Sequence, residues 1–394
     1  MTKTAVLIFI LSSSALYAQK ATPPVTEFAN APFAIELTES VAEILKPPTS
    51  FPALNPAVFN QLNLIFPYKP GQTWQLRYHS PEIGCALVYG FLGNSAILGN
   101  QVGLMPNIAF ETNKQARWGF QTKIGMGFSW FNNPYNILSN PENTLIGSRI
   151  TNITYLGFSY RYTVTDKYNL YAGFSFYHFS NGHYTLPNIG LDAPALTLGV
   201  KRYLGQKSSR ENDNHDSTAV KNDNKLHVNI FAGWGRHQFG SASSSDGPRY
   251  SVYQCALFLS KRYRQIHNWQ AGITFTYYSD YYDYIINQEL FTSGQRLQAT
   301  TIRPFIGHEF IMSHIGLLTQ LGANVYSPFN TKINVYGSRG LSTALGPYIS
   351  FKLGVQYYLN NPLFTNKNRM LVGIYLEARP TGADFPQLGL AWSF

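Results

Sequence analysis

The sequence is poor in charge, in cysteine and in long apolar runs. Only 13% of its 394 residues are Asp, Glu, Lys or Arg, whereas soluble domains usually carry about 25%, so a solvent-coated globule is not expected. No 18 consecutive apolar residues occur, which excludes a helical membrane span. Cys85 and Cys255 are too few for a disulfide framework, and neither a zinc spacing nor a glycine-rich phosphate loop is present. We expect no metal and no cofactor.

The chain is instead aromatic and basic. It has 27 Tyr, 27 Phe and 6 Trp, and a net charge of +10, which suits an anionic partner such as nucleic acid or a phosphorylated lipid surface. Residues 1–18 decide between these partners, because Lys3, the apolar core 5–11 and the ending Ala15-Leu16-Tyr17-Ala18 predict a secretory signal peptide cleaved near Ala18. For an exported protein we expect lipid as the partner and no nucleic acid.

Bulky apolar residues alternate with small or polar ones over long stretches. Similar patterns recur at 225–234, 269–277, 315–325 and 345–357. Strands of soluble sandwiches are usually about 5–6 residues long, whereas strands of about ten or more with one polar face fit a transmembrane barrel. The sequence therefore predicts an all-β, antiparallel transmembrane β-barrel of about 14–16 strands. The clearest stretch, 116–131, places on one face Trp118, Phe120, Thr122, Ile124, Met126, Phe128 and Trp130.

The last strand and the loop lengths predict an orientation. Gln387 to Phe394 alternates and ends at an aromatic residue, as the C-terminal signal of outer-membrane barrels does, so we expect it to bind the barrel-assembly machinery. If this strand runs into the periplasm, the long connections are extracellular and the short ones periplasmic. The expected extracellular connections are 132–149, 181–192, 241–249, 282–297, 327–343 and 380–384.

The strand count leaves two architectures open. We count about fifteen strands from residue 72 onward, and an even number requires one more within 33–66, part of the Pro-rich N-terminal segment 19–66. The polar segment 206–224 separates two sets of roughly eight strands, 67–205 and 225–394. One barrel of about 16 strands and two tandem barrels of eight both satisfy the count. We favour the single barrel, because a linker between two barrels would be longer and stiffer.

One strand carries candidate catalytic residues. Between Tyr168 and Ser180, the lipid-facing set ends in His178 and Ser180, and Asp192 has the same parity on the next strand. Residues two apart on a strand are about 6.7 Å apart along it. The three side chains could serve as base, nucleophile and orienting carboxylate. Asn181, Gly182 and Asn188 could donate to an oxyanion. The alternative is an interfacial histidine beside an ordinary turn.

These residues carry a family resemblance. His178-Phe179-Ser180-Asn181-Gly182, followed by Pro187-Asn188-Ile189-Gly190-Leu191-Asp192, resembles the signature of the outer-membrane lipid A 3-O-deacylases, also called acyloxyacyl hydrolases. Upstream, Asn140-Pro141-Glu142-Asn143 and Ile146-Gly147-Ser148 resemble longer members. The resemblance covers about 67–205 and implies, without a metal, hydrolysis of an ester-linked 3-hydroxyacyl chain of lipid A. It assigns catalysis to Ser180, His178 and Asp192, and the oxyanion to Asn188. Together with Asn181, Gly182 and Gly190, Asn188 is expected to stabilise the oxyanion or position the substrate.

Two further classes remain open. Outer-membrane phospholipase A also resembles this stretch through His-x-Ser-Asn-Gly, but an Asn completes its triad and it requires calcium; Asp192 and the Asn188-x-Gly190 element favour the deacylase. A non-enzymatic porin is the other class. Its channel could be lined by Arg117, Lys123, Arg161, Lys201 and Lys352. His183 and His237 lie in or near expected loops and are expected at the surface.

Overall fold

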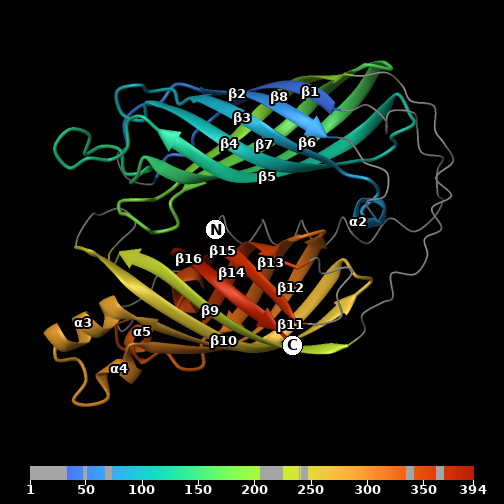
Figure 1. Cartoon of the computed structure of the whole chain (residues 1–394). Helices are drawn as coiled ribbons and strands as arrows, with labels where there is room; N and C mark the ends of the chain where they lie inside the picture. The colour runs from blue at the N-terminus through green and yellow to red at the C-terminus, as the bar shows by residue number, and fades with distance from the viewer. Residues whose placement is uncertain are drawn as a thin grey trace.

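The protein folds into two barrels that lie side by side (Figure 1). Each is a closed antiparallel sheet of eight strands, β1–β8 and β9–β16. The expected signal peptide and the polar segment 206–224 lie outside the described residues. The structure, a computed structural model, describes residues 33–47, 51–66, 73–204, 225–238, 240, 247–333, 341–360 and 368–394.

The first barrel alternates buried polar or aromatic side chains with exposed apolar ones along each strand. Its strands are β1 (Phe33–Ala42), β2 (Ala57–Phe66), β3 (Glu82–Phe91), β4 (Asn100–Glu111), β5 (Trp118–Phe131), β6 (Ile150–Thr165), β7 (Tyr168–Ser180) and β8 (Leu191–Leu204). A short helix, α2 (Thr73–Arg77), lies between β2 and β3.

The second barrel repeats this plan and adds helices between its strands. Its strands are β9 (Leu226–Gln238), β10 (Arg249–Tyr263), β11 (His267–Tyr278), β12 (Thr300–Met312), β13 (Ile315–Ala323), β14 (Ile349–Tyr358), β15 (Arg369–Arg379) and β16 (Gly382–Ser393). The helices are α3 (Ser279–Asn287), α4 (Gln295–Gln298), α5 (Pro328–Ile333) and α6 (Leu341–Leu345).

The predicted all-β barrel class is confirmed, but the favoured single barrel is wrong. β8 pairs with β1 and β16 pairs with β9, so each half closes on itself. Eight strands close a barrel that interior side chains can fill, and neither set needs a strand from the other. The first barrel begins at Phe33 rather than near residue 67. Two strands, not one, lie within 33–66, and the remaining fourteen follow α2.

The outer walls are apolar. On β5, Phe120 and Phe128 are 56% and 61% exposed, and on β8, Leu196 and Leu198 are 63% and 67% exposed. Water would disfavour so many exposed large apolar side chains, whereas lipid accommodates them. The walls therefore have the character of a membrane-spanning β-barrel. Among the helices of the described residues, none is long and apolar enough to cross a membrane.

The barrel interiors hold paired charges. In the first barrel Lys201 Nζ lies 2.6 Å from Glu82 Oε2 and 2.9 Å from Glu111 Oε1, and Lys123 pairs with Glu36. In the second barrel Arg303 Nη1 lies 2.7 Å from Glu377 Oε2.

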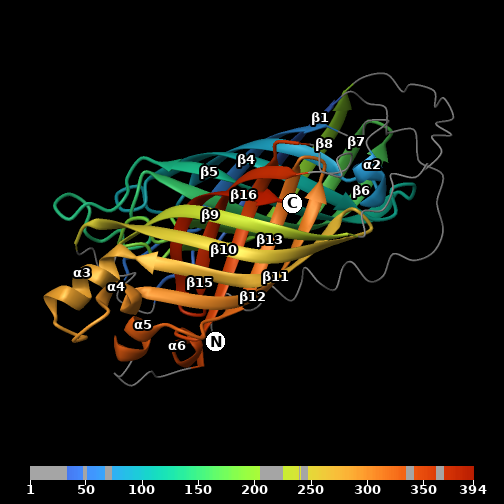
Figure 2. The same cartoon turned by 60° about the horizontal axis from the view of Figure 1, so that its bottom comes forward.

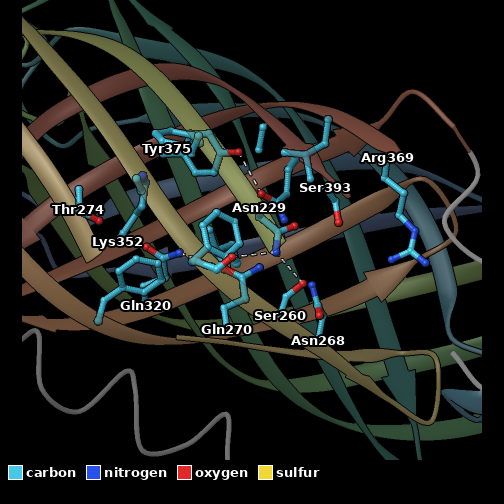
Figure 3. Close-up of a pocket in the computed structure, with 18 of the residues that line it drawn as sticks. Asn229, Ser260, Asn268, Gln270, Thr274, Gln320, Lys352, Arg369, Tyr375 and Ser393 are labelled. Atoms are coloured by element: carbon cyan, nitrogen blue, oxygen red, sulfur yellow. Dashed lines mark hydrogen bonds between the residues drawn. The ribbon is translucent and has the colours of Figure 1, made fainter. Parts of the chain in front are cut away.

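The second interior, lined by Lys352, Tyr375 and Asn229 among others, leaves a cavity of only about 30 Å³ (Figure 3). Of the cations expected to line a channel, Lys123, Arg161, Lys201 and Lys352 are buried and each lies near a carboxylate, whereas Arg117 is exposed. The second interior is thus filled rather than an open pore, and in both barrels the buried cations are paired rather than free.

Most of the long connections of the two barrels lie at the same end, the loop end, whereas the connection between β2 and β3, with α2, lies at the opposite end (Figures 1 and 2). The loop end holds 132–149 and 181–190 of the first barrel and the helices α3 and α5 of the second. The opposite, turn end holds short connections such as 264–266. Contacts join the barrels at the turn end, where Tyr78 Oη donates to Ile266 O at 3.0 Å. The tyrosine-rich segment around Asp280 forms the helix α3.

Candidate active site

Strand β7 is fixed from inside the barrel. Tyr177 and Phe179 point inward and are fully buried; the Tyr177 ring stacks on Phe59 with centroids 4.2 Å apart, and the Phe179 ring meets Phe131 edge-on at 5.4 Å. Because strand side chains alternate, His178 must point outward between these two anchors. The interior packing thus holds the backbone that presents the outward polar residues.

His178 forms a hydrogen-bonded pair with Asp192 on the neighbouring strand. The two residues face each other in the β7–β8 register, and His178 Nδ1 lies 2.7 Å from Asp192 Oδ1. Their side chains are 39% and 25% exposed, so the pair is reachable from outside the barrel. The carboxylate accepts the Nδ1 proton, which leaves Nε2 as the nitrogen that can accept a proton from another group.

Ser180 lies two residues beyond His178 at the end of β7, and its Oγ receives two donors. Asn188 Nδ2 lies 2.9 Å from this oxygen and the Gly182 N–H 3.1 Å. The Asn181 N–H donates to Asn188 Oδ1 at 3.3 Å, which turns the amide nitrogen of Asn188 toward the serine. Among the described residues, the hydrogen bonds of Ser180 Oγ are these two, with none to His178; such bonds commonly tighten only with substrate bound.

Gly190 brings the loop close to both catalytic candidates. A Cβ at this position would lie 3.3 Å from His178 Cε1 and 3.9 Å from Ser180 Cβ, and the residue has φ +85°. That backbone conformation favours glycine. Its N–H donates to Leu145 O at 3.1 Å. Glycine at position 190 therefore allows the loop backbone to approach His178 and Ser180 closely.

The loop 132–149 supports the loop 181–190. Asn181 Nδ2 donates to Ser148 Oγ at 3.2 Å, so the Asn181 side chain organises the two loops. A Cβ at Gly147 would come within 2.1 Å of Pro187 O, so only glycine allows this contact. The upstream resemblance motif thus lies directly against the candidate site.

Asn143 is a supporting residue whose role the sequence did not reveal. It is fully buried; its Nδ2 donates to Asn133 O at 2.8 Å and its Oδ1 accepts from Ile146 N at 3.1 Å. It closes the turn that presents Gly147 and Ser148. The only signal was its place in the resemblance motif, because nothing local distinguishes it from a solvated loop asparagine.

A second polar cluster lies at the loop end of the second barrel. His237 Nδ1 lies 2.6 Å from Asp280 Oδ2, and Asp384 Oδ2 accepts from Tyr278 Oη at 2.7 Å and from Arg379 Nη2 at 3.0 Å. His237 is buried, so its expected surface position is wrong. In the described part of the chain, no group of three His, Cys, Asp or Glu side chains is placed to hold a metal ion.

Fold and polar cluster together define the class: a membrane β-barrel that carries an Asp–His pair and a serine on its lipid-facing wall. Comparison with protein families gives the particular kind. Residues 61–201 match the family Lipid A 3-O-deacylase (PagL), and residues 224–394 match Acyloxyacyl hydrolase, C-terminal domain. The first part of the chain thus matches the lipid A 3-O-deacylases and the second part matches the acyloxyacyl hydrolases, both of which are families of ester-hydrolysing enzymes.

The family resemblance expected from the motifs is confirmed. The second half, which the resemblance did not cover, has a family match of its own. A comparison with curated proteins gives no match.

Solved structures give only distant likenesses. The outer membrane enzyme PagL is 13% identical, with 42% of this chain and 97% of that chain covered and a TM-score of 0.30. Neisserial surface protein A is 12% identical, with 44% and 97% covered and a TM-score of 0.29. A Rhodopseudomonas blastica porin is 5% identical, with 92% and 99% covered and a TM-score of 0.16. At these TM-scores the likenesses add nothing to the family matches.

Proposed function

We propose that the protein is a serine esterase that removes the ester-linked 3-O acyl chain from lipid A in the outer leaflet. The observation that carries the proposal is the His178–Asp192 hydrogen bond beside Ser180, within the stretch that matches the deacylase family. Charged or polar residues are costly on a lipid-facing wall. A hydrogen-bonded pair there, next to a hydroxyl that two amide donors contact, is best explained by chemistry on a lipid.

The reaction follows from the positions of these groups. Ser180 Oγ attacks the ester carbonyl carbon while His178 Nε2 takes the hydroxyl proton, and Asp192 stabilises the resulting imidazolium. The carbonyl oxygen becomes an oxyanion near the Asn188 amide and the Gly182 N–H, the donors now on Ser180 Oγ. Collapse breaks the ester bond, and His178 returns the proton to the leaving sugar hydroxyl. Water then hydrolyses the acyl–serine ester by the same steps and releases the fatty acid.

The outer wall below the site suits an acyl chain. Phe174 on β7 and Leu196 on β8 face outward and are 68% and 63% exposed, and they lie opposite each other in the strand register. Part of the same proposal is that the loop end faces outside the cell, that residues 1–18 direct export, and that β16 with Phe394 is recognised by the barrel-assembly machinery. The substrate then approaches sideways from the membrane.

Mass spectrometry of lipid A tests the proposal. Purified protein should remove one hydroxyacyl mass from lipid A, and Ser180→Ala should not. Loss of this mass in Ser180→Ala would contradict the assigned nucleophile. Release of fatty acid from phospholipid alone, with lipid A intact, would make the protein a phospholipase.

A further inference from the structure

The loop that carries the candidate oxyanion donors also contacts the second barrel. Leu186, in the middle of the loop 181–190, is 1% exposed, and its backbone N–H donates to Gln238 Oε1 of the second barrel at 2.9 Å. His183 Nδ1 donates to Ala383 O at 3.0 Å. The guanidinium of Arg249 lies 4.9 Å from the centre of the Tyr184 ring. Three residues of the loop, His183, Tyr184 and Leu186, therefore contact the other barrel.

The fit is close at Gly182, the residue whose N–H donates to Ser180 Oγ. A Cβ at Gly182 would lie 2.8 Å from Leu376 Cδ1, and the residue has φ +69°. Any side chain would strain the backbone and press on the β15 wall. The donor next to the nucleophile is thus placed directly against the second barrel.

On the second barrel, the contact surface is itself held rigidly. Gln238 is 4% exposed, and its Nε2 donates to Gly247 O at 3.1 Å, which orients the Oε1 that accepts from Leu186. The preceding residue, His237, is bonded to Asp280. A buried side-chain amide whose oxygen and nitrogen both form hydrogen bonds keeps one orientation. Gln238 therefore holds the loop at a fixed position.

The loop 181–190 has supports on two sides. From the first barrel, Leu145 O accepts from the Gly190 N–H at 3.1 Å. From the second barrel, Gln238 holds Leu186, two residues before Asn188. Asn188 lies between these supports, and its Nδ2 is 2.9 Å from Ser180 Oγ. A donor contributes to catalysis only when held close to the place where negative charge develops.

We propose that the second barrel positions the active site of the first: Gln238 holds the loop 181–190 so that the Asn188 amide and the Gly182 N–H remain directed at Ser180. Gln238 touches no reacting atom and is a positioning residue. The proposal rests on the proposed function for its activity readout, and it gives the second family domain a role in a reaction whose side chains all lie in the first.

Substitution of Gln238 tests this inference in the full-length protein. Gln238→Met keeps the length of the side chain but removes the acceptor, and we expect kcat to fall about tenfold with KM within about twofold, because binding of the acyl chain is unaffected. Gln238→Glu keeps an acceptor oxygen for Leu186 and should retain more activity than Gln238→Met. Arg249→Leu, an exposed change, should lower kcat by about threefold, since it removes one weaker contact.

The matched control lies at the turn end. Tyr78→Phe removes the inter-barrel hydrogen bond to Ile266 without touching the loop, and kcat should remain that of the wild type. All variants are compared as folded barrels, selected by their faster gel migration before heating. Unchanged kcat in folded Gln238→Met, or a rise in KM alone, overturns the positioning role.

A second readout separates this inference from the proposed function. A fluorophosphonate reacts with an activated serine whatever the natural substrate is, so its rate of labelling at Ser180 should fall about tenfold in Gln238→Met. If the wild type releases no acyl chain from lipid A but shows this difference in labelling, the substrate is wrong and the positioning role stands. Equal labelling of both proteins, or no labelling of wild-type Ser180, contradicts the positioning role.

Discussion

At the scale of single residues, the Asp192 carboxylate is expected to fix the orientation and the tautomer of the His178 ring. It accepts the Nδ1 proton at 2.7 Å, and this bond fixes the ring and its tautomer. Asp192→Asn keeps the size but loses the charge that stabilises the imidazolium, so kcat should fall about a hundredfold or more. In Asp192→Glu, which keeps a carboxylate, kcat should fall less. Initial rates of fatty-acid release measure both; equal rates for Asn and wild type would remove Asp192 from the mechanism.

Asn188 is expected to act on the transition state rather than on binding. Its Nδ2 lies 2.9 Å from Ser180 Oγ and its Oδ1 is held by the Asn181 N–H. Asn188→Ala should therefore lower kcat about a hundredfold and change KM little. Asn60→Ala replaces an exposed asparagine on the β2 wall and serves as the control. Steady-state kinetics on one ester substrate give both constants, and an effect confined to KM would argue for a substrate contact instead.

The parts of the site that could be predicted are those that depend on residues close together in the sequence. His178, Ser180 and Asp192 were assigned to one face because strand side chains alternate with period two, and the register places His178 opposite Asp192. The close approach of Gly190 to His178 depends on loop conformation, which alternation does not encode. The contact between Leu186 and Gln238 joins residues 52 apart in sequence, and nothing local marks Gln238 as its partner.

At the scale of elements, the loop 181–190 has a built-in sensitivity to acid at His183. Burial, and next the neighbouring His237, lower the pKa of His183 from its ordinary 6.5. Asp384 and the Ala383 carbonyl act in the opposite direction and Arg379 in the same one, but the balance favours the neutral ring. Nδ1 already donates to Ala383 O, and Nε2 is buried without a partner among the described residues. A second proton there would have no acceptor.

Docking of this loop should consequently weaken in acid. Because the folded pKa lies below the unfolded value, the contribution of neutral His183 is fully present above about pH 6.5 and is lost as the pH falls below it. His183→Asn keeps a neutral donor for Ala383 O and should be less sensitive. Hydrogen exchange of the loop at pH 7.5 and pH 5.5 measures docking directly. Exchange that rises equally in both proteins at low pH would exclude His183 as the cause.

The strands illustrate what alternation predicts at this scale. β5 appears where the sequence showed long alternation, because one face meets lipid and the other the interior. β1 and β2 were less evident, since prolines lie on both sides of them and only one strand was expected within 33–66. α3 follows β11 within a tyrosine-rich segment whose aromatic residues also suit a membrane girdle. Composition alone did not separate the two.

At the scale of the whole molecule, the pairing of the first and last strands closes each barrel and decides the architecture. This pairing joins residues that are far apart in the sequence. Pairing of β1 with β8 joins residues such as Leu37 and Val200, and no hairpin pattern predicts it. The sequences of Tyr168–Gly182 and Arg369–Gly382 are faintly alike. These segments are β7 and β15, the seventh strands of their barrels. The likeness therefore relates equivalent positions of two separately closed units.

Two closed units should unfold separately. Lys201 is fully buried between Glu82 and Glu111 in the first barrel, and Arg303 pairs with Glu377 in the second. Removing Lys201 leaves Glu111 with Arg161 and Glu82 with the Tyr203 hydroxyl, and removing Arg303 leaves Glu377 with Lys352 at 3.6 Å. Loss of the nearest cation from a buried carboxylate should therefore cost somewhat less than the roughly 3–5 kcal/mol of a fully broken buried pair. Lys201→Met should thus lower the urea midpoint of the first barrel alone, and Arg303→Met that of the second. Tryptophan fluorescence of single-tryptophan variants, Trp130 for the first barrel and Trp234 for the second, follows each unit. If either substitution shifted both midpoints equally, the two barrels would unfold as one cooperative unit. The loop-end contacts between Gln238 and the loop 181–190 would then be too few to explain the coupling of the two barrels.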